Sequence, residues 1–361
     1  MRAMISPKSL LFVCIGLFIT ALLFHSARGP WDVHESAVDY KSPTTSNEAL
    51  KEPIEFNDAH GPPSIHDSAH KELTADLEDD SVARKRVPDA IVVGAGKCGT
   101  DALITYLNTS RSFVINTLFE SGMKELNYFN TNYEMGTQWY IDQMPAVKDK
   151  QVLIEKCAPY FWDPAVPSRV HSLKPDMKLI MVLCDPVKRL VSLYTHINSY
   201  KLGDGSDPLP PFTDLLQVKD GQITESYHPR PVMPFLKTGL YSDFIEQWLK
   251  YFPLNQMVFV SGEELVRDPL PELAKVTKFL GKPNAVTSDN MYYDKERGFF
   301  CFKGYDQSKS CMSRSTKGRK HPVLDSELLK TLQDHFRPYN EKLELMIGQR
   351  FGWPTYFGQS S

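Results

Sequence analysis

A short glycine loop that contains a lysine and a threonine is the first stretch of this sequence that could do chemistry. Residues 94–100 (GAGKCGT) follow an apolar run, residues 90–93, and precede an amphipathic run, residues 101–108. That order predicts a strand, a tight loop and a helix. Backbone N–H groups at the start of the helix, the helix dipole and the charge of Lys97 all favour an anion. The loop therefore predicts a site for a phosphate or sulfate ester.

The loop differs from one known phosphate-binding loop and partly matches another. The loop of P-loop NTPases has its lysine after the last glycine, whereas Lys97 precedes the last glycine here. The three glycines do fit the spacing of a dinucleotide loop, which needs an acid about 20 residues further on, at the end of a second strand. Glu120 and Glu125 lie roughly there, but no clean apolar strand precedes them. NAD therefore remains the alternative cofactor from the loop alone.

The elements that would position this loop are visible as alternating apolar and amphipathic runs. Buried strands without polar alternation, separated by helices, indicate an α/β fold with a parallel sheet covered on both faces. Ligands bind at the carboxyl ends of the strands in such sheets, which is where the glycine loop lies. The predicted strands are 90–94, 151–154, 178–184 and 256–261, and the predicted helices are 99–108, 187–200, 240–251 and 271–280.

The N-terminal quarter of the chain differs from the rest. Residues 10–24 carry no charge and follow Arg2 and Lys8, which predicts a membrane anchor over residues 10–25 with a cytosolic tail, residues 1–9, and a luminal remainder. A cleaved signal peptide is the alternative. Residues 26–88 are polar and acidic, with a net charge of −6, and predict a disordered stem. Residues 89–356 then form one domain with a net charge near zero, and we expect no nucleic-acid partner.

The cysteines and one sequon fit a secretory compartment. Cys301 and Cys311 bracket a short polar loop, which predicts a local disulfide in an oxidising lumen. One N-glycosylation sequon begins at Asn108. No cysteine or histidine spacing typical of a metal site occurs, so we expect no metal. Free, partly buried thiols are expected at three other positions: Cys98, Cys157 and Cys184.

Several motifs in order carry a resemblance to a known family. They include GAGKCGTDAL, KELNYFN, EKCAPYF, DPVKRLVSLYTH, KERGFFCFKG and STKGRKHP. Over about residues 88–354 the chain resembles the heparan sulfate glucosaminyl 3-O-sulfotransferases, a family of Golgi carbohydrate sulfotransferases. The resemblance implies the sulfotransferase fold, a P-loop-like parallel sheet flanked by helices. It also implies 3'-phosphoadenosine 5'-phosphosulfate as donor, heparan sulfate as acceptor, transfer to a glucosamine 3-hydroxyl, and a single-pass type II protein of the Golgi membrane.

The resemblance assigns donor contacts to three stretches of the sequence. The glycine loop would wrap the 5'-phosphosulfate, and Ser192 would touch the 3'-phosphate. A basic cluster near residue 318 would close over the donor from the far side. The predicted donor-binding residues are Lys97, Cys98, Gly99, Thr100, Asp101, Cys184, Ser192, Lys317, Gly318, Arg319, Lys320 and His321.

The resemblance also assigns the chemistry. Glu125, in the KEL motif, matches the family's catalytic glutamate, and an ionised carboxylate can take the proton of an acceptor hydroxyl. Lys97 and Lys156 would neutralise charge on the leaving phosphate and the sulfuryl oxygens. The residues predicted to bind the acceptor are Lys124, Lys156, Arg314 and His321.

The chain departs from the family pattern at several of these positions. Cys184 stands where an arginine is usual, which removes one donor contact, and Asp101 reverses the charge of another usual arginine. Gly96, Asn127 and Asn130 also replace charged or basic residues. Because N-sulfotransferases share some of these changes, sulfation of the glucosamine nitrogen is one alternative. A catalytically weak, glycan-binding pseudoenzyme is another.

Overall fold

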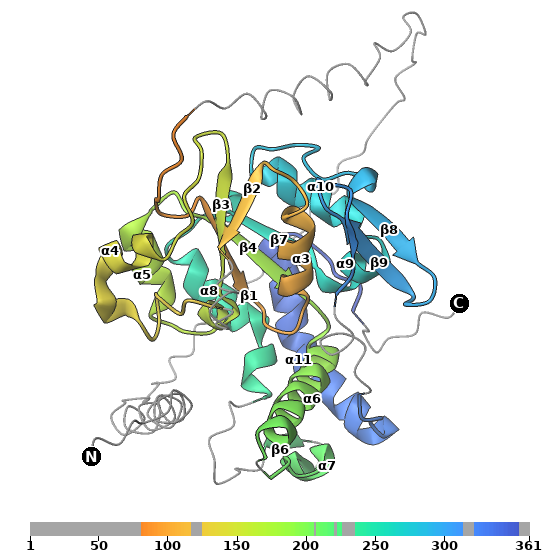
Figure 1. Ribbon diagram of the computed structural model, residues 1–361. Helices are drawn as coiled ribbons and strands as arrows, with labels where there is room; N and C mark the ends of the chain where they lie inside the picture. The colour runs from red at the N-terminus through yellow and green to blue at the C-terminus, as the bar shows by residue number, and fades with distance from the viewer. Residues whose placement is uncertain are drawn as a thin grey trace, which may run out of the picture. The chain divides into compact units, whose positions relative to one another are not determined.

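A five-stranded parallel sheet forms the centre of the protein, in the strand order β2-β3-β1-β4-β7 (Figure 1). Every neighbouring pair in it is parallel. The parallel α/β sheet predicted from the apolar runs is therefore confirmed. Its strands are β1 (Ala90–Gly94), β2 (Phe113–Asn116), β3 (Val152–Lys156), β4 (Lys178–Leu183) and β7 (Met257–Ser261).

The computed structural model describes residues 81–116, 125–205, 207–219, 222–225, 235–312 and 321–353. The expected anchor, residues 10–25, and most of the expected stem lie outside these residues. In the described part of the chain, no helix has the length and apolar character that a membrane crossing requires.

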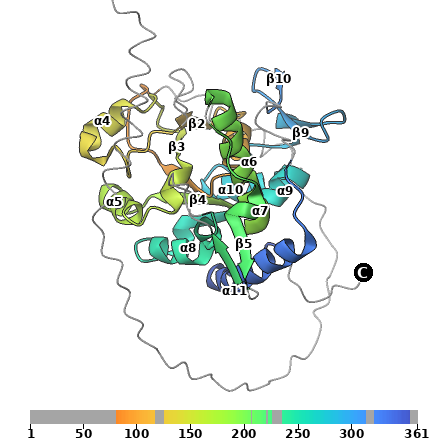
Figure 2. The same cartoon turned by 90° about the horizontal axis from the view of Figure 1, so that it is seen from below.

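Helices cover both faces of the sheet, which is why its strands are mostly apolar and mostly buried. All five residues of β1 and of β7 are buried. The helices α3 (Thr100–Leu107) and α8 (Tyr241–Leu249) lie on opposite sides of the sheet (Figures 1 and 2). The helix α10 (Pro269–Phe279) contacts α3, and the long α11 (Ser326–Ile347) contacts α8.

The remaining elements surround this core. Two antiparallel units are separate from the central sheet: β5 pairs with β6, and β8, β9 and β10 form a three-stranded sheet. The other helices are α4 (Gly136–Asp142), α5 (Val166–Leu173), α6 (Pro186–Asp204), α7 (Phe212–Leu215) and α9 (Gly262–Arg267). The short strands are β5 (Leu216–Lys219), β6 (Gln222–Glu225), β8 (Met291–Asp294), β9 (Phe299–Lys303) and β10 (Lys309–Ser310). The 3-10 turns are η2 (Tyr133–Met135), η3 (Ala158–Phe161), η4 (Lys237–Gly239), η5 (Leu254–Gln256) and η6 (Ser288–Asn290).

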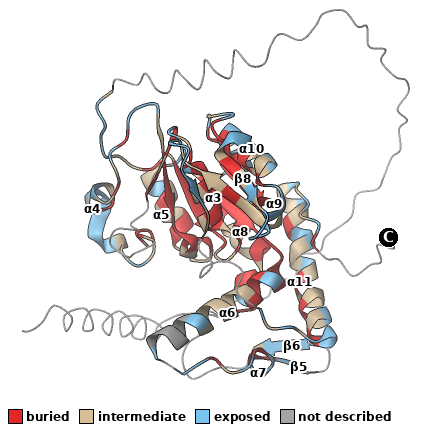
Figure 3. Cartoon of the chain, turned by 45° about the vertical axis from the view of Figure 1, so that its right-hand side comes forward, coloured by how far each residue is buried: buried red, intermediate tan, exposed pale blue. Residues whose placement is uncertain are grey.

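A second, smaller core holds α6 against α7, β5 and the first half of α11. Figure 3 shows this part beside the central sheet, with buried residues along the inner sides of α6 and α11. The sequence analysis did not predict α11. Asp325 caps its first turn by accepting a hydrogen bond from the Leu328 N–H (2.8 Å), and its buried side chains include Leu332 and Phe336, one helical turn apart.

The sheet order excludes the dinucleotide arrangement considered above. The strand β2, which was not predicted from the sequence, follows α3 and ends at Asn116. However, β2 pairs with β3, and β3 separates it from β1. In the dinucleotide fold the second strand lies directly beside the first, so that its acid reaches the ribose. That neighbour is absent from the described sheet.

Residues that precede the predicted domain boundary at residue 89 already contact the domain. Arg84 and Val147 exchange two backbone hydrogen bonds, both 3.0 Å long. Arg86 donates to the carboxylate of Asp89 and to the backbone carbonyl of Gln151 (2.8 Å). These last residues of the expected stem are thus held against the start of the sheet.

Candidate active site

A cavity of about 750 Å³ opens at the carboxyl ends of β1, β3 and β4. This is the edge at which ligands bind in parallel α/β sheets. Predicted site residues that are far apart in the sequence line it together. They are Lys97, Cys98, Gly99, Thr100, Asp101, Glu125, Lys156, Cys184, Ser192 and His321.

The glycine loop connects β1 to α3 in a conformation that few residues adopt. Lys97 has φ 77° and Gly99 has φ 105°, both in the left-handed region. Glycine adopts this region readily, whereas a lysine there needs support from its surroundings. Ala95 supplies some of it by donating its N–H to the Val182 carbonyl of β4 (2.8 Å). The loop thus leads directly to the first N–H groups of α3, which begins at Thr100.

Lys156 is the central charge of the cavity. It ends β3, and its ammonium lies 2.9 Å from Oε1 of Glu125 and 2.9 Å from Oδ1 of Asp101. Burial lowers the pKa of Lys156, but the carboxylates of Asp101 and Glu125 outweigh burial and raise the pKa above its ordinary value. The lysine is therefore positively charged at neutral pH although only 5% of its side chain is exposed.

Glu125 is oriented by two donors on one oxygen. Its Oε1 accepts hydrogen bonds from Lys156 and from the backbone N–H of Ala158 (3.1 Å). The Glu125 side chain lines the cavity and is 21% exposed. Asn127, one of the departures from the family, bonds back to the Glu125 carbonyl (3.3 Å). An ionised carboxylate held in this way can accept a proton from a bound hydroxyl.

The residue before Lys156 points to the other face of the sheet, as strand alternation requires. Glu155 is buried and accepts hydrogen bonds from the hydroxyls of Tyr140 and Tyr160. Burial raises the pKa of Glu155 to about 7, although the two tyrosine hydrogen bonds oppose that shift. Glu155 therefore anchors β3 from behind, while Lys156 faces the cavity.

Arg189 is a cavity residue that the sequence analysis did not single out. It lies on α6, is 1% exposed, and donates to the Gly96 carbonyl (3.1 Å) and the Thr238 hydroxyl (2.9 Å). Its Nη2 is buried with no hydrogen-bond partner among the described residues. A buried guanidinium bearing an unsatisfied donor beside a phosphate-type loop fits an anionic ligand. Its place one turn into α6, after the Asp-Pro pair of the DPVKR motif, was the available signal.

The cysteines correct one part of the sequence interpretation. Cys98 and Cys184 were expected as free thiols, but they form a disulfide with Cα atoms 5.2 Å apart. Cys157 is free and buried, as expected, and burial raises the pKa of its thiol. The predicted Cys301–Cys311 disulfide is present. Asp294, Cys301 and Cys311 lie close enough together to suggest a metal site. However, the two sulfurs are bonded to each other and are therefore not available as metal ligands.

Six of the predicted site residues lie outside the residues that the structure describes. Met312, which precedes the basic cluster, and His321, its last residue, both line the cavity. Asn108, the sequon asparagine, is exposed at the end of α3 and remains a prediction as a glycosylation site. The predicted site residues outside the described ranges are Lys124, Arg314, Lys317, Gly318, Arg319 and Lys320.

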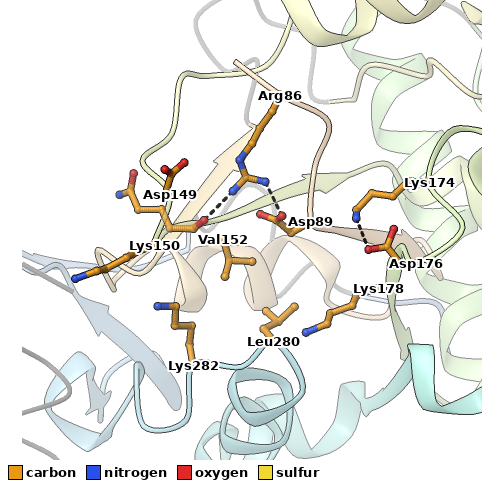
Figure 4. Close-up of a pocket in the computed structure, with 11 residues that line it drawn as sticks. Arg86, Asp89, Asp149, Lys150, Val152, Lys174, Asp176, Lys178, Leu280 and Lys282 are labelled. Carbon is orange, nitrogen blue, oxygen red and sulfur yellow. Dashed lines mark hydrogen bonds and ion pairs between the residues drawn. The ribbon is translucent and has the colours of Figure 1, made fainter. Parts of the chain in front are cut away.

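A smaller cavity of about 340 Å³ lies at the amino ends of the strands, opposite the first cavity (Figure 4). Its charged side chains partly pair with one another: Arg86 contacts Asp89, and Lys174 lies 2.8 Å from Asp176. None of the predicted site residues lines it. We therefore assign the chemistry to the larger cavity, which contains the glycine loop.

Comparison with known proteins identifies the family. The sulfotransferase domain model matches residues 87–347, which include the whole parallel sheet and the cavity. The chain belongs to the sulfotransferase family. Within the family it is 36% identical over 273 residues to human heparan sulfate glucosamine 3-O-sulfotransferase 6, a match that covers 75% of each chain.

Other relatives extend this comparison. The chain is 36% identical over 274 residues to human heparan sulfate glucosamine 3-O-sulfotransferase 3B1, covering 74% of this chain and 65% of the relative. It thus spans somewhat less than two thirds of that protein. A solved sulfotransferase from Alicyclobacillus acidocaldarius, 22% identical, superposes with a TM-score of 0.52 over 73% of this chain and 97% of that one. This similarity confirms the predicted sulfotransferase fold.

Proposed function

We propose that the chain transfers a sulfuryl group from 3'-phosphoadenosine 5'-phosphosulfate to the 3-hydroxyl of glucosamine residues in heparan sulfate. The observation that carries this proposal is the contact between Glu125 and Lys156 inside the cavity of the glycine loop. It places a proton acceptor and a positive charge side by side, next to an anion-binding loop. The names of the relatives support the transfer of a sulfuryl group and the acceptor.

The side chains of the cavity fit a polyanionic nucleotide. Five lysines and arginines line it against three acidic residues. The N–H groups at the start of α3 and the ammonium of Lys97 would hold the 5'-phosphosulfate. Ser192 and the unsatisfied Nη2 of Arg189 lie on α6 on another side of the cavity, where they could hold a further phosphate.

The arrangement supports transfer by positioning and charge stabilisation. The donor supplies an activated sulfur, and the acceptor oxygen attacks it in line, so that the new O–S bond forms as the S–O bond to the leaving phosphate breaks. Glu125 takes the proton of the attacking hydroxyl. Lys97 and Lys156 stabilise the negative charge that develops on the leaving phosphate. We propose that these two lysines take the place of a metal ion.

The position of Asp101 in the glycine loop predicts a donor contact, but its carboxylate has another partner in the structure. As a reversed charge in the donor loop, it would repel the donor. Instead its carboxylate contacts Lys156 and helps to keep that lysine protonated. We propose that Asp101 tunes the charge of Lys156 and contributes little direct donor contact.

We further propose a Golgi membrane protein of single-pass type II orientation. The uncharged run at residues 10–25 and the basic residues before it support an anchor. Two disulfides in the domain are typical of an oxidising, luminal compartment.

Product mapping tests the reaction. The full-length chain, purified in detergent, is incubated with ³⁵S-labelled donor and heparan sulfate, and the labelled disaccharides are identified. We expect label on the glucosamine 3-oxygen. Label on the glucosamine nitrogen would select the N-sulfotransferase alternative. Retention on heparin without any transfer would select the glycan-binding pseudoenzyme.

A further inference from the structure

The Cys98–Cys184 disulfide joins two sides of the cavity that lie 86 residues apart in the sequence. Cys98 lies in the glycine loop, between Lys97 and Gly99. Cys184 follows directly after β4. Both residues line the cavity and both are at least nine-tenths buried. A covalent bond at this point acts on the loop itself, rather than on a distant part of the surface.

We propose that this disulfide is a positioning element of the donor site, which keeps the glycine loop in its nucleotide-binding conformation. The proposal rests on the proposed function, because it takes the ligand of the loop to be the nucleotide. The disulfide itself takes no part in the transfer. It raises nucleotide affinity by removing the cost of ordering the loop when the ligand binds.

The loop needs such a restraint because its backbone is held in a conformation of low population. Lys97, next to Cys98, has a positive φ, and a non-glycine residue keeps this conformation only where the surrounding structure imposes it. The disulfide fixes the residue immediately after Lys97 to the end of a buried strand. The loop is therefore restrained at the point where its backbone is least favourable.

Other residues pack closely around the disulfide and hold both cysteines in place. The hydroxyl of Tyr241 donates to the Cys184 carbonyl (2.9 Å) and lies 3.5 Å from Sγ of Cys98. A Cβ on Gly262 would lie 2.4 Å from the Cys98 carbonyl oxygen and 3.0 Å from Cβ of Cys184. Only glycine permits α9 to begin this close to both cysteines. On the other side of the loop, Arg189 holds the Gly96 carbonyl.

Removing the bond in three ways gives a direct test. In the full-length chain, Cys98→Ser, Cys184→Ser and the double variant each break the same bond. We expect all three to weaken binding of adenosine 3',5'-bisphosphate about tenfold and by the same factor, because changes that remove one shared interaction are not additive. The KM for heparan sulfate should change less than twofold. The dissociation constant is measured by titration calorimetry, beside a melting curve for each variant.

The second disulfide supplies a matched control. A Cys301→Ser/Cys311→Ser variant loses a bond of the same kind outside the cavity, and should keep bisphosphate affinity within twofold. In this background a phosphine reductant then opens Cys98–Cys184. Two electrons and two protons convert the disulfide to two thiols, and the phosphine is oxidised with an oxygen from water. We expect the same tenfold loss, which provides the test if the serine variants at Cys98 and Cys184 do not fold.

The outcomes separate this inference from the proposed function. If the wild-type chain does not bind the bisphosphate, the proposed function is wrong and the inference falls with it. If the wild type binds, but the folded variants or the reduced control protein bind equally well, only the inference is overturned. It is also overturned if the effects of Cys98→Ser and Cys184→Ser add, because the two thiols would then act separately.

Discussion

Two carboxylates contact the same ammonium at the same distance, and this allows a sharp test of which one is the base. Glu125 and Asp101 each lie 2.9 Å from Nζ of Lys156. Both Glu125→Gln and Asp101→Asn remove one negative charge and keep the size of the side chain. In Glu125→Gln the amide oxygen can still accept from Lys156 and from Ala158, because both bonds go to a single oxygen. The glutamine therefore keeps its position but takes no proton at neutral pH.

The expected magnitudes differ widely. Loss of a general base lowers kcat by about 10²–10⁴, and we expect that range for Glu125→Gln with little change in nucleotide affinity. Asp101 is 50% exposed, and an ion pair with such a partner contributes less than about 1 kcal/mol. Asp101→Asn should therefore lower kcat no more than about fivefold.

Steady-state kinetics with labelled donor and heparan sulfate measures both variants under the same conditions. A fall of less than tenfold in Glu125→Gln would refute its role as the base. Equal losses in the two variants would mean that the carboxylates act only through the charge of Lys156.

Three further predictions concern the loop, β3 and α9. Lys97→Ala should weaken bisphosphate binding and lower kcat together, because it removes charge from both the bound donor and the transition state; a change confined to the KM for heparan sulfate would contradict this. Glu155 has its pKa raised by burial from 4.5 to about 7, so the folded state binds its proton more tightly than the unfolded state and loses stability as pH rises through that window. Urea unfolding should therefore show Glu155→Gln gaining stability relative to wild type between pH 4.5 and pH 7, by up to about 3 kcal/mol, whereas a difference independent of pH would contradict the raised pKa. Gly262→Ala should lower the free energy of unfolding by about 1–3 kcal/mol through overpacking against Cys98, and a melting temperature equal to that of wild type would refute that close contact.

The features that the sequence predicted are those with a local signal. The strand β1 and residues 179–183 of β4 are continuous apolar runs because both faces of the sheet are covered, and the glycine loop follows β1 directly. The four-residue β2 has no comparable run. The helix α11 does have apolar side chains at helical spacing, but it comes after the last motif that had been assigned a role.

The features that the sequence missed depend on contacts between distant residues. Cys98 and Cys184 are 86 residues apart, and nothing in the sequence around either cysteine indicates that the fold brings them together. The contact between Asp101 and Lys156 is likewise invisible in the sequence. It explains how an anion-binding loop can contain an acidic residue, because the carboxylate pairs with a lysine. Arg189 lies within the DPVKR motif, but its buried, unsatisfied nitrogen depends on how α6 packs against the loop.

A crystal structure of the chain with adenosine 3',5'-bisphosphate and a heparan sulfate oligosaccharide tests the central claim most directly. We predict the 5'-phosphate at the N–H groups of residues 96–100, and a glucosamine 3-oxygen within about 2.6–3.2 Å of a Glu125 carboxylate oxygen, the distance that proton transfer requires. Nucleotide bound instead in the smaller cavity at the opposite edge of the sheet, or an acceptor hydroxyl placed away from Glu125, would contradict it.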